Sequence, residues 1–212
     1  MKKTVIFIVF AALAVSLFAQ QDPQAKAALE KSVAILKSSS VKLSFITTID
    51  SPSSKNKQNF AGTLFLMGNK FKLIMNGAES YFNGKMQWVY VPENNEVTIS
   101  TISAKEQKNV NPLSVLSQYN GKDTKIIFNK ESAPTANSLL IDIFPTNKNS
   151  NEFRIIVKID KRTFSPQSIQ LFDRNGTRST VIVKSFQKIT AESKNFEFDV
   201  KAHPKVLVND LR

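Results

Sequence analysis

The chain has 212 residues, of which 42% are hydrophobic and 22% are charged, a balance that suits one folded domain and excludes a disordered chain. It has no cysteine, which excludes disulfides, thiolate metal sites and a cysteine nucleophile, and its one histidine, His203, excludes a histidine-cluster metal site. The net charge of +12 points to an anionic partner: nucleic acid, a membrane surface or an acidic protein.

The N-terminus has the form of a secretory signal peptide. Two lysines precede an apolar run over residues 5–18, and the sequence then becomes polar. The run is short for a membrane span of ~20 residues. We therefore expect cleavage after Ala19 and export to a bacterial periplasm, with a retained anchor as the alternative. The signal peptide would be residues 1–19 and the mature protein one domain of residues 20–212, and export counts against nucleic acid as a partner.

The mature sequence begins with a helical pattern. Asp22 followed by Pro23 is typical of a helix start, with a capping side chain and a proline in the first turn. Apolar residues recur at helical spacing from Ala25 to Leu36, and the serines at 38–40 end the pattern. We predict one amphipathic helix with an apolar face and a lysine-rich face.

From Val41 onward the apolar residues alternate with polar ones. This period predicts about ten antiparallel strands, each with one buried and one solvated face. Asn-Gly pairs, the strongest short hairpin signal, separate the segments at 76–77, 83–84, 120–121 and 175–176. The pairs at 83–84 and 175–176 have the clearest flanking strands.

A second helix is predicted in the middle of the chain. Asn111 and Pro112 precede a short apolar segment, a pattern typical of an N-cap followed by a proline in the first turn. The sequence thus predicts a mainly β domain of the α+β class. A curled sheet or an incomplete, half-open antiparallel barrel, with helices across its concave side, would bury the apolar faces of both kinds of element.

The search for catalytic chemistry is mostly negative. The sequence has no glycine-rich phosphate loop, Gly-x-Ser-x-Gly elbow or His-Glu-x-x-His motif, so we expect neither an enzyme nor a cofactor or metal. His203 precedes Pro204, where a surface histidine in a turn is expected. Asp142, Asp160 and Asp173 fall on separate strands or strand ends, where we expect exposed positions and turn formers, although strands could bring a carboxylate pair together.

Large apolar side chains are abundant. The chain has 16 Phe, 4 Met and 1 Trp. Such residues build an ordinary core, but Met and Phe also line cavities that bind apolar ligands of variable shape. Composition leaves both interpretations open.

Several segments in order resemble the periplasmic outer-membrane lipoprotein carrier (LolA) family. Residues 59–73 (NFAGTLFLMGNKFKL) resemble its opening strands, and residues 83–92 (NGKMQWVYVP) resemble its Asp-Gly-Lys-x-x-Trp-x-Tyr-x-Pro segment. The proline-led segment 111–116, the hairpin over 171–183 and the ending over 196–210 also match. The resemblance implies an incomplete antiparallel barrel with a helical lid over an apolar cavity.

In that family, the cavity holds the acyl chains of a lipoprotein that an inner-membrane ABC transporter releases, and the carrier delivers them to the outer membrane. The resemblance therefore implies a monomeric carrier whose partners are acylated lipoproteins, the transporter and an outer-membrane acceptor. The positions that match cavity or lid residues are Leu29, Val33, Phe65, Phe71, Leu73, Met75, Trp88, Leu113 and Leu116. The local alternation separately places Lys70 and Lys72 on the opposite face of their strand.

The sequence departs from the family at two turns. Many members carry Arg-Pro before the Phe strand, and that Arg is thought to hold the lid closed, whereas this chain has Met67-Gly68-Asn69 and no Arg. The usual Gly after the C-terminal Pro is Lys205 here. We therefore carry three hypotheses: a lipoprotein chaperone, a periplasmic lipid-binding or sensing module on the same fold, and an exported enzyme.

Overall fold

The computed structural model describes residues 21–102, 106, 111, 113–119, 123–130 and 137–212. The expected signal peptide and the Asn-Gly pair at 120–121 lie outside these residues. Among the helices of the described residues, none is both long enough and apolar enough to cross a membrane.

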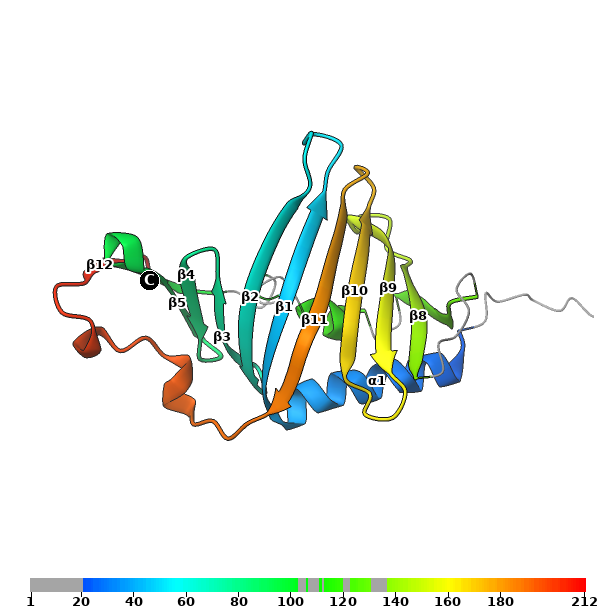
Figure 1. The fold of residues 1–212 in the computed structure, drawn as a ribbon, viewed down its shortest axis with the longest axis horizontal. Helices are drawn as coiled ribbons and strands as arrows, with labels where there is room; N and C mark the ends of the chain where they lie inside the picture. Colours follow the sequence, from blue (N-terminus) through cyan, green and yellow to red (C-terminus); the bar gives the residue numbers. More distant parts are fainter. Residues whose placement is uncertain (1–20, 103–105, 107–110, 112, 120–122, 131–136) are drawn as a thin grey trace, which may run out of the picture.

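The predicted N-terminal helix is confirmed as α1 (Pro23–Ser38). Its cap is local: the Asp22 carboxylate accepts hydrogen bonds from the backbone N–H of Gln24 at 2.9 Å and of Ala25 at 3.1 Å. Figure 1 shows α1 running across the strands at one end of the sheet. Its apolar face is buried against the sheet, and Leu29 is fully buried.

The strands of the described residues form one sheet. They are β1 (Ser40–Asp50), β2 (Gln58–Met67), β3 (Lys70–Met75), β4 (Ala78–Phe82), β5 (Met86–Val91), β6 (Glu96–Thr101), β7 (Thr124–Phe128), β8 (Ser138–Pro145), β9 (Glu152–Asp160), β10 (Pro166–Asp173), β11 (Arg178–Lys188) and β12 (Leu207–Asp210). Their order is β12-β6-β5-β4-β3-β2-β1-β11-β10-β9-β8-β7. The sheet is curved but does not close, because β12 and β7 are its two edges.

All neighbouring strands of this sheet pair antiparallel except β12 with β6, which are parallel. The sequence predicted about ten strands and missed β12, because Leu207–Asp210 is short and exposed along its whole length and so shows no alternation of burial.

The tightest predicted turn joins β3 and β4. Asn76 and Gly77 both lie in the left-handed region, with φ of +55° and +71°, as a two-residue turn between twisted strands requires. The other described Asn-Gly pairs also form turns, although only the glycine of each has a positive φ: +100° at Gly84 and +86° at Gly176. The pairs at 83–84 and 175–176 have the clearest flanking strands in the sequence, but the tightest turn is at 76–77.

The mid-chain helix is α2 (Ser114–Gln118), which begins later than the sequence pattern predicted. The predicted Asn111 cap is wrong: Leu113 is the N-cap and no side chain caps the helix, while the Asn111 side-chain oxygen accepts a hydrogen bond from the Leu113 N–H at 3.0 Å in the turn before it. α2 and α1 lie on the same face of the sheet, which we call the inner face; the opposite face is the outer face.

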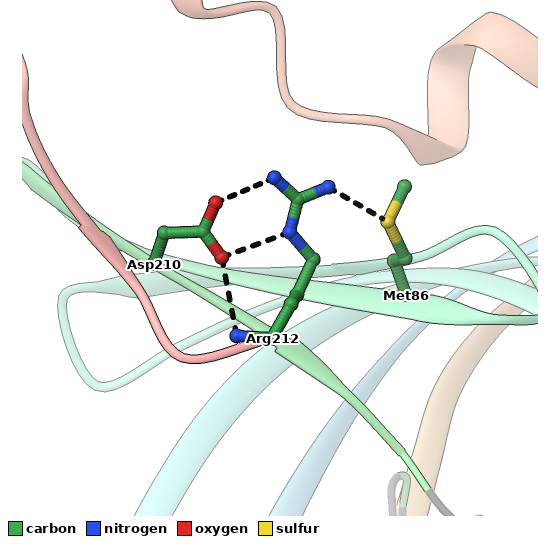
Figure 2. A network of polar contacts seen from close by, with 3 residues as sticks. All are labelled: Met86, Asp210 and Arg212. Carbon is green, nitrogen blue, oxygen red and sulfur yellow. Dashed lines mark hydrogen bonds and ion pairs between the residues drawn. The ribbon is translucent and has the colours of Figure 1, made fainter.

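The C-terminal residues cross the outer face. The segment 189–206 contains the short helices η3 (Ser193–Phe196) and η4 (Val200–Ala202) and leads from β11 to the edge strand β12, past β3 to β5 (Figure 1). The last residue, Arg212, donates from its guanidinium to Asp210 and to the Met86 sulfur of β5 (Figure 2). The end of the chain is thereby fastened to the strands it covers.

Candidate ligand cavity

A cavity of about 490 Å³ lies on the inner face, between α2 and the sheet. This volume falls in the range typical of small-molecule sites, about 300–1,000 Å³. Its apolar lining comes from Ile49, Phe60, Leu73, Met75, Val115, Leu171 and Val181. Polar groups in the lining come from Thr47, Asn76, Asn111, Ser114, Gln118, Glu152 and Ser179.

A smaller cavity of about 180 Å³ lies on the other side of α2. It is lined mainly by α1, the β2–β3 turn, Phe82 of β4 and the α2 segment. Asn111 and Ser114 line both cavities, whereas Val115 faces the larger one and Leu116 the smaller one. The single turn of helix in α2 is thus the wall between the two cavities.

The structure brings five of the nine predicted site residues to these two cavities. Leu73 and Met75 line the larger cavity, and Val33, Leu113 and Leu116 line the smaller one. Leu29 and Phe71 lie on the inner face but belong to the packed core, with side chains at most 1% exposed. Lys72 lies on the outer face, as the local alternation predicted.

Phe65 and Trp88 are not with the others, because both lie on the outer face. Phe65 pairs across strands with Lys72, and the Lys42 ammonium lies 5.4 Å from the centre of its ring. Trp88 belongs to an outer aromatic cluster, which we define as Tyr81, Trp88, Tyr90, Val97, Ile99 and Phe198. Phe198 of the C-terminal segment lies 5.8 Å from Tyr81 and 4.8 Å from Tyr90, between ring centres. Neither Phe65 nor Trp88 can contribute to the cavity from this face.

The larger cavity has a polar side that no sequence pattern predicted. Glu152, at the start of β9, accepts a hydrogen bond from the Tyr119 hydroxyl at 2.7 Å through Oε2. Burial raises the pKa of Tyr119 to about 12; the Ser150 hydroxyl opposes this shift, and the hydrogen bond to Glu152 and its charge add to it. The Thr47 hydroxyl oxygen is buried and has no hydrogen-bond partner among the described residues. The Glu152–Tyr119 hydrogen bond and the position of the Thr47 hydroxyl both depend on strand pairing, which the sequence alone does not show.

A second carboxyl group lies beside Glu152. Asp173, the last residue of β10, pairs across strands with Glu152 at a β-bulge. Burial raises the pKa of Asp173, and the negative charge of Glu152 raises it further. Glu152 thus lines the larger cavity, and a second carboxyl group lies behind it on the neighbouring strand.

The three aspartates considered for catalysis do not come together. Asp142 is not the exposed residue that we expected: it is 4% exposed on the outer face, where it binds Arg154 at 3.0 Å and accepts from Asn129 at 2.9 Å. A polar residue inside a strand can be buried when an ion pair compensates it. Asp160 does form a turn, since its carboxylate accepts from the N–H of Arg162 and Thr163.

His203 occupies a turn as expected, but its ring is packed. It stacks on Phe198 at 4.3 Å and lies 4.8 Å from Tyr90, between ring centres. Within the described part of the chain, no group of three or more His, Asp or Glu residues could hold a metal ion.

The comparisons with known families decide the relationship. The family model for "Outer membrane lipoprotein carrier protein LolA" matches residues 15–176, most of the chain. The chain belongs to the LolA family. Its resemblance to that family, inferred from the sequence, is thereby confirmed. A search of curated proteins found no match.

One solved structure shares this fold at low sequence identity, and two others are less similar. An uncharacterized conserved protein from Thermus thermophilus superposes with a TM-score of 0.56 at 10% identity, covering 88% of this chain and 99% of that one. A LolA superfamily protein from Nitrosomonas europaea has a TM-score of 0.44 at 10% identity, covering 82% and 98%. A putative outer membrane lipoprotein-sorting protein domain from Vibrio parahaemolyticus has a TM-score of 0.44 at 13% identity, covering 82% and 97%.

Proposed function

We propose that this protein is a periplasmic chaperone that binds the acyl chains of lipoproteins and carries them from the inner to the outer membrane. The observation that carries this proposal is the larger cavity, which opens on the inner face of a LolA-family sheet and has an apolar wall. Leu73 and Met75 in that wall are only partly buried, so a bound chain would cover apolar surface that is otherwise wet. The proposed role is binding and transfer without covalent catalysis.

The energetics suit a carrier. Each methylene group that leaves water contributes about 0.8 kcal/mol, so a shielded acyl chain is strongly favoured over a free one. A methylene occupies roughly the volume of a water molecule, ~30 Å³, so the larger cavity accommodates about one long chain. A cargo with several chains needs more room. Movement of α2 toward the smaller cavity behind it would enlarge the site.

In this proposal α2 is the movable part of the lid. It is one short helix between two cavities, whereas α1 is long and packed on the core. The lid works without the family's turn arginine: Gly68 and Asn69 occupy that β2–β3 turn and line the smaller cavity. Closure would rest on apolar contacts of Leu113 and Leu116 with α1.

The decisive test is release of cargo. The mature protein, added with ATP to inner-membrane vesicles that contain the lipoprotein-releasing transporter, should bring an acylated lipoprotein into the soluble fraction. An established carrier from the same source is the positive control. Failure of this protein where the control succeeds would contradict the lipoprotein role, and binding to outer-membrane vesicles would then test the acceptor step separately.

A second candidate is a periplasmic lipid-binding or sensing module with a ligand other than a lipoprotein. The size of the larger cavity favours it, since one chain fits without movement of α2. Mass spectrometry of apolar material that co-purifies with the protein distinguishes the two. A diacylglyceryl-modified peptide supports the carrier, and a free lipid supports the sensing module.

A further inference from the structure

The larger cavity and the protein as a whole have opposite charge. The chain carries 29 Lys and Arg against 17 Asp and Glu. Among the described residues that line the larger cavity, however, the one charged residue is Glu152. A basic protein attracts anionic lipids to its surface, so the sign of the charge at the cavity decides which of them can enter.

Glu152 is held in place by its neighbours. Its Oε2 accepts from the Tyr119 hydroxyl at 2.7 Å, and the Ser150 hydroxyl lies 3.4 Å from the same oxygen. Its other oxygen, Oε1, accepts no hydrogen bond from any residue that the structure describes. One side of the carboxylate is therefore fixed by the protein, and the other is available to a ligand.

Among the described residues, no cation neutralises this carboxylate. Asp173 adds a second carboxyl group across the strand pair. Arg174 lies on the same turn, but its Nε donates to the Ser150 carbonyl oxygen at 3.1 Å and forms no ion pair with Glu152 or Asp173. Arg154, two residues after Glu152, points to the outer face and pairs with Asp142.

We propose that Glu152, with Asp173 as its cross-strand neighbour, sets the headgroup preference of the cavity. The site accepts an acyl chain whose polar end donates hydrogen bonds, such as the amide of an acylated peptide, and rejects a chain that ends in a carboxylate or phosphate. An acceptor-only carboxylate binds N–H donors and repels anions at close range. This inference rests on the proposed acyl-chain function and adds the selection of cargo over free fatty acids and anionic phospholipids.

The test compares two single-chain probes of similar length, N-dodecylacetamide and dodecanoate, by calorimetric titration of the mature protein below their micelle concentrations. We expect the wild type to bind the amide about tenfold more tightly than the carboxylate. Glu152→Gln keeps an oxygen acceptor for Tyr119 and removes the charge. It should tighten dodecanoate binding about tenfold, because the repulsion is removed, and weaken amide binding about threefold, because the Gln amide nitrogen takes the place of Oε1 and cannot accept the ligand N–H.

Glu93→Gln is the matched control, since Glu93 is exposed in the short helix η1 (Pro92–Asn94) and lines none of the described cavities. It makes the same change in net charge and should leave the ratio of the two affinities unchanged. An unchanged ratio in Glu152→Gln, or an equal change in Glu93→Gln, would overturn the headgroup assignment alone. Absence of binding of both probes to the wild type would overturn the acyl-chain function itself.

Discussion

The two faces of the sheet near β3, β4 and β5 are built from the same strands but are packed differently. On the outer face, Tyr81 and Trp88 are each 7% exposed and Val97 is fully buried, because the C-terminal segment covers them. On the inner face, Leu73 and Met75 are only partly buried and line a cavity under α2. An apolar face that is filled stabilises the fold, and one that is left unfilled can hold a guest. From this difference we expect the outer aromatic cluster to contribute to stability and the unfilled part of the inner face, at Leu73 and Met75, to bind.

The largest effect should follow from emptying the outer aromatic cluster. Trp88→Ala removes a buried indole and should lower the free energy of unfolding by about 3–5 kcal/mol, with little change in acyl-chain binding to the folded fraction. Urea denaturation and probe titration measure the two quantities. Trp88→Phe is the conservative control and should lose less than half as much. If Trp88→Ala weakens binding at nearly unchanged stability, the division between the faces fails.

A smaller loss of stability should follow from a substitution at Gly62, where β2 packs closely against the Phe45 ring of the core. Gly62 of β2 lies under the Phe45 ring, and a Cβ at Gly62 would lie 2.5 Å from the ring Cζ. Gly62→Ala should therefore push the ring aside and cost about 1–3 kcal/mol in urea denaturation. Adding Phe45→Leu makes room for the methyl group, so the double variant should lose less than the sum of the single losses. If the losses of the two single variants simply add in the double variant, Gly62 and Phe45 are not in steric contact.

Local patterns predicted what local contacts determine. The Asp22 cap and the extent of α1 follow from residues within one turn of each other. The alternation within β3 placed Phe71, Leu73 and Met75 on one face and Lys72 on the other, as observed. The family resemblance, not the alternation, predicted Trp88 in the cavity. Alternation could not correct that prediction, because Tyr81 and Phe82 on the neighbouring strand are adjacent and both buried, which hides the period there.

The carboxyl group that lines the cavity and the one behind it could not be predicted for a related reason. Glu152 and Asp173 are far apart in the sequence, and they meet only because a β-bulge between Phe172 and Asp173 shifts the pairing of β9 and β10. The burial of Asp142 likewise depends on Arg154, which reaches it from the neighbouring strand. Long-range register decides these positions, and a single sequence does not show register.

The binding role of the inner face is tested at Leu73. Leu73→Glu puts a carboxylate in the apolar wall and should weaken N-dodecylacetamide binding at least about tenfold. Because Leu73 is only partly buried, we expect a loss of stability of only about 1 kcal/mol. Leu64, its fully buried cross-strand neighbour, is the contrast: Leu64→Glu should prevent folding. If Leu73→Glu unfolds the protein as readily, Leu73 belongs to the core.

The smallest effect concerns the segment that covers the outer face. Lys205 stands where the LolA family usually has Gly, and its φ of +58° lies in the left-handed region, which costs a residue with a side chain about 1–2 kcal/mol. Lys205→Gly relieves that strain. Glycine also makes the unfolded chain more flexible, which lowers the free energy of unfolding by about 0.5–1 kcal/mol. The net result should be stabilisation of about 0.5 kcal/mol in urea denaturation. Lys201→Gly, in the short helix η4, is the matched control and should destabilise, since Lys201 has no positive φ to relieve. Destabilisation by Lys205→Gly would mean that the Lys205 side chain contributes more to holding this segment than its backbone strain costs.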